Sequence, residues 1–298
     1  MSEAVPRSKV EPGSGGEGHT PLGPDGLELE PTDRRLVELS RAELLADLEE
    51  TEIPEAGAVG GLAAGAPASR SGLLRPTVVI GDDDRVPVAD PTAFPWQAIC
   101  FLAITAADGS PLRATGWLAG PRLVVTAGHC VYRHERGGWA RSVEVVPGRN
   151  GGDHRFGTFA VPRADLRSVI GWTERHDHDF DYGALLLPRS LAGEVGFFGF
   201  EVASDDALRS QPWNLGGYPD DREPGTLWWH ARRIEIVSTN TLLYNIDTFG
   251  GQSGAPLWRN DAGGPLVAGV HSGERSGANQ AVRISPSVHA NLRSWKQL

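Results

Sequence analysis

"TGWLAGPRLVVTAGHC", residues 115–130, contains two short apolar runs, and the Gly-Pro pair between them is typical of a turn. Similar runs recur along the rest of the chain: TVVIG, WQAICFLAIT, SVEVVPG, YGALLLP, RRIEIVST, TLLYNI, APLW and PLVAGVHS. Glycine, proline, asparagine or aspartate separates them. Many short strands at this spacing predict an antiparallel all-β barrel or sandwich, and they argue against alternating β and α units.

The C-terminal sequence SPSVHANLRSWKQL predicts one helix. Ser285 is a candidate N-cap, and Pro286 fits the first helical position, where no backbone N–H is needed. Val288, Leu292 and Trp295 then fall on one face of the helix. We therefore expect a terminal helix whose apolar face packs against the β-structure.

The N-terminal part of the sequence differs in composition from the remainder of the chain. Residues 1–31 are rich in Gly, Pro and Glu without apolar periodicity, which predicts disorder. Residues 32–50 carry leucines at helical spacing and predict one or two short helices, and residues 54–76 are typical of a linker. The expected organisation is an N-terminal segment over 1–77 and a β-domain over 78–298.

The formal net charge is −10, and most of the excess lies in residues 1–77, which hold 14 acidic and 7 basic side chains. An acidic chain argues against nucleic acid as a partner. No run approaches the roughly 18 apolar residues of a membrane helix, so we expect no membrane partner. The first residues, MSEAVPRSKVEPGSGGEGHT, lack the apolar centre of a secretory signal peptide.

Three polar residues beside apolar strands could carry nucleophilic catalysis. Ser253 lies in the glycine-bounded turn GGQSGAP, His129 follows the apolar run in VVTAGHCV, and Asp181 precedes the run in HDFDYGALLL. A serine hydroxyl needs a base to take its proton, and that base needs a third group to orient it. The backbone N–H groups of Gly251 and Ser253 could stabilise an oxyanion, because a glycine at 251 leaves the approach open. Taken singly, each residue also fits a structural role in a turn, a cap or a core.

The sequence RHDHDFD concentrates possible metal ligands just before the run that follows Asp181. These residues are His176, Asp177, His178, Asp179 and Asp181. Successive side chains on a loop alternate in direction and rarely converge on one ion. We therefore expect neither a metal nor another cofactor. Asp179 is the alternative to Asp181 as the acid that orients the histidine.

The motifs TAGHC, DYGAL and GGQSGAP, in the order His129, Asp181, Ser253 and on an all-β background, resemble the trypsin-like serine endopeptidases. Within that group the chain is similar to the bacterial glutamyl endopeptidases over about residues 78–298, including VVIGDDDR near the start of the barrel. The resemblance implies two six-stranded antiparallel barrels with the catalytic triad between them. His129 and Asp181 would come from the first barrel and Ser253 from the second, and peptide or protein substrates would be cut through an acyl-enzyme.

The resemblance also implies that the substrate carries a glutamate side chain before the cut bond. Family members recognise it with a threonine five residues before the nucleophile, which is Thr248 here, and with a histidine in a Gly-X-His setting, which is His271 in AGVHSG. A hydroxyl and an imidazole N–H can each donate to a carboxylate. Ser272 follows, where the family's strand pairs with the substrate backbone, and Glu274 would repel an acidic ligand unless it points away. The alternative is that Thr248 lies in a strand and His271 in the core.

A third contact in the family is the α-ammonium group of the mature N-terminus. The spacing to Arg85 in VVIGDDDR places this group at Val78, after an activating protease has cut the Thr77–Val78 bond. Residues 1–77 would then be a propeptide, and the alternative is an extension that is never removed. The resemblance implies an extracellular enzyme, although the chain shows no recognisable signal peptide.

Cys100 and Cys130 are the two cysteines of the chain, and they allow either one disulfide or two buried thiols. In many relatives the cysteine beside the catalytic histidine bridges to one just before a Thr-Gly pair. Ala114 stands there in this chain, but Cys100 lies on the preceding predicted strand, which could run antiparallel and still approach Cys130. The resemblance therefore predicts a Cys100–Cys130 bridge.

These expectations combine into a serine endopeptidase that is made as a zymogen and cuts after acidic residues, chiefly glutamate. One alternative is the same kind of enzyme with a specificity for small or apolar residues. Another is a trypsin-like fold that has lost proteolysis and serves only in binding. The complete set of His129, Asp181 and Ser253 argues against this last alternative.

Overall fold

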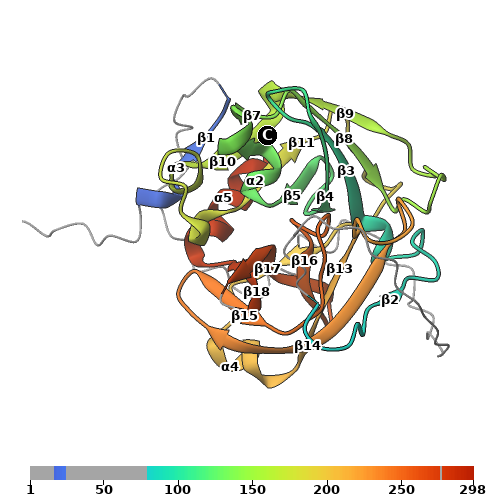
Figure 1. Cartoon of the computed structure of the whole chain (residues 1–298), viewed down its shortest axis with the longest axis vertical. Helices are drawn as coiled ribbons and strands as arrows, with labels where there is room; N and C mark the ends of the chain where they lie inside the picture. Colours follow the sequence, from blue (N-terminus) through green and yellow to red (C-terminus); the bar gives the residue numbers. More distant parts are fainter. Residues whose placement is uncertain (1–16, 25–78, 276) are drawn as a thin grey trace, which may run out of the picture.

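Two largely antiparallel β-sheets form the body of the protein, as the computed structural model shows for residues 17–24, 79–275 and 277–298. The first sheet fills the upper half of Figure 1 and the second the lower half. The helices are short, apart from the one at the C-terminus. The all-β prediction is therefore confirmed.

The first sheet has the strand order β1-β10-β11-β5-β4-β3-β8-β9. Its strands are β1 (Pro21–Leu22), β3 (Ile99–Thr105), β4 (Pro111–Leu118), β5 (Leu123–Thr126), β8 (Ser142–Pro147), β9 (Phe159–Pro162), β10 (Leu166–Val169) and β11 (Gly183–Leu186). The stretch 115–130 supplies part of β4 and all of β5, which pair with Trp117 opposite Val125. The sheet has eight strands where six were expected, and β1, from the N-terminal segment, is one of the additions.

The second sheet closes on itself. Its order is β12-β17-β16-β13-β14-β15-β18, and a further pairing of β17 with β18 completes a six-stranded barrel, while β2 pairs with β14. The strands are β2 (Val86–Pro87), β12 (Gly199–Phe200), β13 (Pro212–Gly217), β14 (Trp228–Val237), β15 (Thr241–Tyr244), β16 (Pro256–Asp261), β17 (Gly264–Arg275) and β18 (Ala278–Arg283).

Short helices and one small hairpin occupy the connections. They are η1 (Glu17–His19), η2 (Trp96–Ala98), α2 (Gly128–Val131), β6 (Tyr132–Arg133), η3 (His134–Arg136), β7 (Gly138–Trp139), η4 (Arg163–Asp165), α3 (Ile170–Thr173), η5 (His178–Phe180), α4 (Asp205–Ser210) and α5 (Pro286–Lys296). The predicted C-terminal helix is confirmed as α5, which Ser285 caps by accepting the N–H of Val288 at 3.4 Å. In the described ranges, no helix has both the length and the apolar character needed to cross a bilayer.

Aromatic side chains fill the space between the two sheets. Trp117 of β4 packs edge-on against Phe198, whose ring centroid lies 6.0 Å away. Phe198 in turn contacts Trp258 of β16, with 5.6 Å between the centroids. The three rings belong to one buried cluster that also takes in the apolar face of α5. This shared core fixes the sheets relative to each other, and with them the loops at their junction.

The prediction of disorder over residues 1–31 is wrong for residues 17–24. Pro21 and Leu22 form β1 and pair with Val169 and Ser168 of β10 at the edge of the first sheet (Figure 1). A strand of two residues leaves no periodic pattern in the sequence, because its stability depends on a distant partner. The predicted helices of 32–50 and the linker of 54–76 lie outside the described residues.

The predicted Cys100–Cys130 bridge is also wrong, because both cysteines are buried free thiols. Cys100 lies on β3, whereas Cys130 follows β5, and β4 runs between these two strands. Neighbouring strands are about 4.8 Å apart, so two spacings exceed the roughly 6.8 Å between Cα atoms that a disulfide can span. The Cys130 thiol instead lies 3.9 Å from the carbonyl oxygen of Ser253.

Candidate active site

His129 and Asp181 meet where two neighbouring strands of the first sheet end. His129 lies in α2 just after β5, Asp181 lies just before β11, and these strands pair with Gly183 opposite Thr126. The backbone N–H of His129 donates to Asp181 Oδ1 at 2.7 Å, and the ring Nδ1 lies 2.8 Å from Oδ2. The carboxylate is only 1% exposed, so both of its oxygens are held out of water.

The electrostatics of this pair favour a strongly basic imidazole. Burial lowers the pKa of His129, but attraction to the Asp181 carboxylate and to Cys130 outweighs burial and raises the pKa above its ordinary value. Because Nδ1 faces a carboxylate, it carries the ring hydrogen, and Nε2 is left as the basic nitrogen of the neutral ring.

Gly128 lets the histidine turn approach the acid closely. A Cβ at this position would lie 2.8 Å from Cδ1 of Trp172 and 3.0 Å from Oδ1 of Asp181. The Trp172 indole is fixed by a hydrogen bond from Nε1 to the carbonyl of Tyr132 at 2.8 Å. Sequence reasoning missed Trp172, whose place beside the histidine depends on how α3 packs and not on a local motif.

The alternative acid, Asp179, points elsewhere. Its carboxylate forms an ion pair with Arg275 at 2.9 Å, while the neighbouring Asp177 caps its backbone N–H at 3.0 Å. His176 stacks on His134 with 4.0 Å between the ring centroids. Within RHDHDFD, therefore, only Asp181 reaches His129.

The loop that carries Ser253 packs directly on the strands that lead to His129. The carbonyl of Ser253 accepts the N–H of Thr115 at 2.9 Å. At Gly254, where φ is +88°, a Cβ would lie 2.2 Å from both Thr115 O and Thr126 Oγ1, so only glycine fits. Thr126 is the last residue of β5, the strand that leads to His129. This contact therefore brings the loop of Ser253 next to the end of that strand. The Ser253 hydroxyl makes no hydrogen bond to any other described residue.

Gly251 adopts a conformation that side chains rarely allow. Its φ is +96°, and a Cβ there would lie 2.4 Å from the carbonyl oxygen of Tyr218. Thr115 Oγ1 donates to the Gly251 carbonyl at 2.8 Å and so holds the peptide in place. Across the part of the chain that the structure describes, the N–H groups of Gly251 and Ser253 find no protein acceptor.

Thr248 and His271 lie against two consecutive residues of β18. The Thr248 hydroxyl donates to Asn279 Oδ1 at 3.0 Å. The Nδ1 atom of His271 lies 3.1 Å from the carbonyl of Gln280 and 2.8 Å from the Tyr244 hydroxyl. Both side chains are buried. Asn279 and Gln280 escaped sequence reasoning because strand pairing, rather than a motif, brings them here.

The charge of His271 follows from its burial. Burial lowers the pKa of His271 to about 4, so the ring is neutral at physiological pH. The Nδ1 atom lies between the Gln280 carbonyl, which can only accept, and the Tyr244 hydroxyl, which can donate or accept, so these contacts are compatible with a hydrogen on either ring nitrogen.

Ser272 and Glu274, which follow His271 on β17, lie in different environments. Ser272 is half-buried, and its hydroxyl lies 3.5 Å from the carbonyl of Gln280. Glu274 is exposed, and its carboxylate accepts the N–H of Gly277 at 3.1 Å, within the β17–β18 turn. Glu274 is thus turned away from His271.

Comparison with known proteins shows the family of this chain. The trypsin family model matches residues 86–296. The chain belongs to the trypsin family. A glutamyl endopeptidase of Bacillus licheniformis is 38% identical over 226 residues, covering 73% of this chain and 69% of that protein. A Bacillus subtilis protein named extracellular metalloprotease is 36% identical over 225 residues, covering 74% of this chain and 71% of that protein. The family recognised from the sequence motifs is confirmed.

Solved structures of two other proteases share the fold. A Glu endopeptidase in complex with MPD superimposes with a TM-score of 0.66 at 24% identity, covering 74% of this chain and all of that one. The protease Anisep from Arthrobacter nicotinovorans gives a TM-score of 0.57 at 20% identity, covering 68% of this chain and 96% of that one. This chain is a trypsin-like serine endopeptidase.

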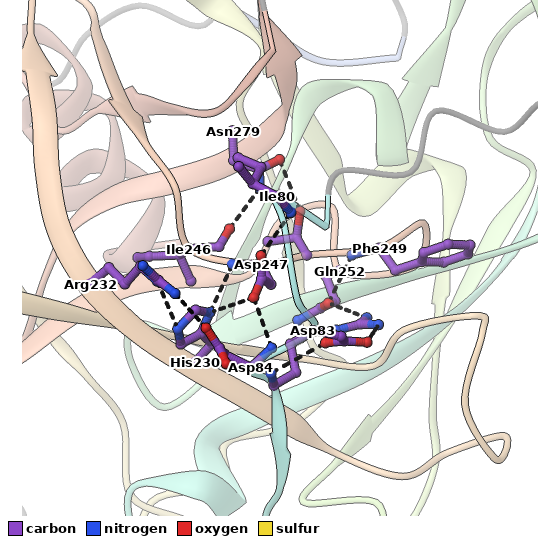
Figure 2. Close-up of polar contacts among 12 residues, drawn as sticks. Ile80, Asp83, Asp84, His230, Arg232, Ile246, Asp247, Phe249, Gln252 and Asn279 are labelled. Atoms are coloured by element: carbon purple, nitrogen blue, oxygen red, sulfur yellow. Dashed lines mark hydrogen bonds and ion pairs between the residues drawn. The ribbon is translucent and has the colours of Figure 1, made fainter. Parts of the chain in front are cut away.

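In this trypsin-family chain, Asp247 precedes Thr248 in the sequence and holds the backbone of Ile80 and Asp84 (Figure 2). Its carboxylate is fully buried and accepts the N–H of Ile80 at 2.9 Å through Oδ1 and the N–H of Asp84 at 3.0 Å through Oδ2. Val78 itself lies outside the described residues. Sequence reasoning missed Asp247, although its position directly before Thr248 was a signal.

Arg85 lies underneath the loop that leads to the nucleophile. Its side chain is fully buried and forms ion pairs with Asp83 at 2.8 Å and Asp221 at 2.6 Å. Its Nη1 also donates at 3.4 Å to Gln252 Oε1. The same Gln252 oxygen accepts the N–H of Phe249 at 3.0 Å (Figure 2). In the sequence, Arg85 is only a reference point for locating Val78, because Asp221 and Gln252 lie too far along the chain to leave a local pattern.

One group of described residues could hold a cation. Ligand atoms of Asp84, His230 and Asp247 lie within 4.8 Å of one another. Arg232 forms an ion pair with Asp84, however, and two backbone N–H groups occupy the Asp247 carboxylate. The lone pairs a metal would need are already taken by protein donors, so this set fits an ion poorly.

Proposed function

We propose that this protease cuts peptide bonds after glutamate, with Ser253 as nucleophile, His129 as general base and Asp181 as the group that orients the base. The observation that carries the proposal is the two-point bond of the buried Asp181 carboxylate to His129. The hydrogen bond at Nδ1 fixes the tautomer in which Nδ1 carries the hydrogen and Nε2 is the basic nitrogen. The unengaged hydroxyl of Ser253 lies on the adjoining loop.

The proposed reaction passes through an acyl-enzyme. Ser253 Oγ attacks the scissile carbonyl carbon while its proton moves to His129 Nε2, and the carbonyl oxygen becomes an oxyanion. The unpartnered N–H groups of Gly251 and Ser253 donate to this oxyanion. His129 then gives the proton to the leaving amine, and a water molecule repeats the sequence to release the acid. Asp181 remains ionised and stabilises the imidazolium.

Thr248 and His271 are proposed to bind the substrate carboxylate. Support comes from their contacts to neighbouring residues of β18 and from their burial, which strengthens hydrogen bonds to a charge. Thr248 must turn its hydrogen away from Asn279 to donate to a ligand. The half-buried Ser272 lies next to His271 on β17, where its backbone would pair with the substrate peptide.

The third proposed carboxylate contact is the amine of Val78, created when an activating protease cuts the Thr77–Val78 bond. Ile80, two residues further on, is held by Asp247 directly beside Thr248. A new terminus at Val78 would therefore start close to the proposed pocket and bring a positive charge to it. Residues 1–77 are proposed to be a propeptide and the enzyme to act outside the cell.

The proposal is tested with the uncut chain and with a form that begins at Val78. Hydrolysis is measured on peptides that differ only in having Glu, Asp, Gln, Phe or Lys before the scissile bond, with Ser253→Ala as the inactive control. We expect the Val78 form alone to cut rapidly, after Glu far better than after Gln. Cleavage after Gln or Phe as fast as after Glu would contradict the roles proposed for Thr248, His271 and Val78.

Two further measurements separate the proposal from other kinds of activity. A fluorophosphonate probe should label Ser253, and its failure in the Val78 form would favour a binding protein without proteolysis. Activity should survive a metal chelator, since the proposed steps use only protein groups. Loss of activity in the chelator, restored by added metal, would instead favour a metalloprotease.

A further inference from the structure

The described N-terminal residues pack into a site formed by β10, the Phe180–Tyr182 turn and α5, which is called the groove below. β1 extends the edge of the sheet beside β10, as Figure 1 shows in blue. The carbonyl of Thr20 accepts the N–H of Ile170 at 3.0 Å, which continues the pairing beyond the strand. Leu22 is only 6% exposed. The segment therefore binds as an added strand with an anchoring apolar side chain, the arrangement by which extended peptides bind sheet edges.

A buried polar network holds the same segment from the other side. The side-chain amide of Asn291, in α5, donates to the carbonyl of His19 at 2.7 Å and to the Tyr182 hydroxyl at 2.8 Å. The Tyr182 hydroxyl lies 3.0 Å from His19 Nδ1. Burial lowers the pKa of His19 to about 4, so the neutral ring can accept the tyrosine hydrogen. Asn291 and Tyr182 thus each have a hydrogen-bond partner in His19.

The shape of the groove requires glycine in the segment. A Cβ on Gly18 would lie 2.2 Å from the ring of Phe180. On the opposite wall, a Cβ on Gly171 would lie 2.4 Å from the same ring and 2.8 Å from the carbonyl oxygen of Gly18. The Phe180 ring therefore lies between two backbones that approach it as closely as glycine permits.

The groove lies directly behind the catalytic acid. Phe180 and Tyr182 are the two neighbours of Asp181 in the chain. Tyr182 is fully buried and Phe180 is 8% exposed in the presence of the segment. His19 contacts both rings, with centroids 4.7 and 5.9 Å away. Removing the segment would uncover the residues that hold the Asp181 turn.

We propose that the groove formed by β10, the Phe180–Tyr182 turn and α5 is a binding site for residues 18–22, GHTPL, and that this segment stays bound as a non-covalent ligand once the chain is cut. The inference deepens the proposed function, because it rests on the proposed cut before Val78. The contacts named above join residues 18–22 to the β-domain itself, so the cut removes only a tether. The active enzyme is then a complex of two chains, with the shorter chain supporting the turn of Asp181.

The test uses a full-length Ser253→Ala chain in which a site for a sequence-specific protease replaces residues 66–71. Cutting at that site depends neither on the proposed activation bond nor on this protein's own activity. The cut protein is passed over a gel-filtration column at micromolar concentration, and the N-terminal fragment in the β-domain peak is measured by mass spectrometry. We expect the fragment to remain in that peak.

Gly18→Val is the informative variant, because the added side chain meets the Phe180 ring and nothing within 79–298 changes. We expect at least a tenfold loss of retained fragment. Gly152→Val is the matched control, because a Cβ there meets nothing within 4 Å. Fragment that separates from the unsubstituted protein, or is retained equally by Gly18→Val, would overturn the proposal.

Hydrogen exchange provides a second readout on the uncut chains. The N–H of Ile170 is bonded to Thr20 only while the segment is bound, so it should exchange faster in Gly18→Val than in the Gly152→Val control. Exchange of Tyr182 should rise with it, if the segment supports the Asp181 turn. Unchanged exchange at both positions would contradict the inference even if the fragment co-elutes.

Discussion

Asp181 bonds His129 twice, at the backbone N–H and at the ring Nδ1, with both distances below 2.9 Å. The backbone bond ties the position of α2 to the start of β11, and the ring bond then sets the rotation of the imidazole. One carboxylate thus controls both where the base lies and which nitrogen is basic.

Replacing Asp181 with asparagine should lower kcat by about 10⁴-fold, because an amide can donate to Nδ1 and stabilise the wrong tautomer. The Val78 form would be assayed on a glutamyl peptide, with circular dichroism as the check on folding. Asp179→Asn is the matched control, because Asp179 pairs with the exposed Arg275. Equal losses in the two variants would contradict the assignment of Asp181.

On the acidic side of its pH profile, kcat/KM should fall to half its maximum at a pH above 6.5, the ordinary pKa of histidine. The reason is that Asp181 raises the pKa of His129. The ring must be neutral to accept the serine proton, so activity is lost as the pH falls through that raised pKa. A peptide with glutamine before the cut bond isolates this effect from carboxylate binding. A limb clearly below pH 6.5 would show that His129 is not the base or is not paired as described.

The preference for glutamate over glutamine should fall as the pH rises. His271 is neutral in the empty pocket, with a pKa of about 4, and a bound carboxylate raises that pKa, so binding of glutamate favours uptake of a proton by the ring. That uptake becomes less favourable by up to about tenfold per pH unit. The ratio of kcat/KM for the two peptides cancels the titration of His129. In His271→Gln this ratio should no longer depend on pH. A ratio that does not change with pH in the unsubstituted enzyme would contradict the role proposed for His271.

Arg85→Gln should lower the free energy of unfolding by about 3 kcal/mol, near the lower end for a broken buried ion pair, because its two carboxylate partners keep some contact with water. Urea unfolding of Ser253→Ala chains measures this change without self-digestion. Arg189→Gln is the control, since its pair with Glu194 lies at the surface and should change the free energy of unfolding very little. Similar losses in both variants would show that burial of Arg85 adds nothing.

The sequence predicted those parts of the site that local motifs encode. Gly128 beside His129, and Gly251 and Gly254 on either side of Ser253, have no room for a Cβ, and such turns leave a readable pattern. Asp247 and Arg85 act on partners more than 130 residues away, so no window of sequence contains both sides of the contact. The prediction of a Cys100–Cys130 bridge was wrong for a related reason. The order of strands within a sheet cannot be read from the sequence of any single strand.

Gly254 brings the two sheets together backbone against backbone, one residue from the nucleophile. Its N–H donates to the carbonyl of His271 in the second sheet at 2.7 Å, while the preceding carbonyl accepts from Thr115 in the first. The two sheets therefore meet here at a residue without a side chain, and backbone hydrogen bonds alone set their spacing beside the nucleophile. A larger residue at 254 would push the turn of Ser253 away from Thr115 and Thr126 and so separate the serine from the strand that leads to His129.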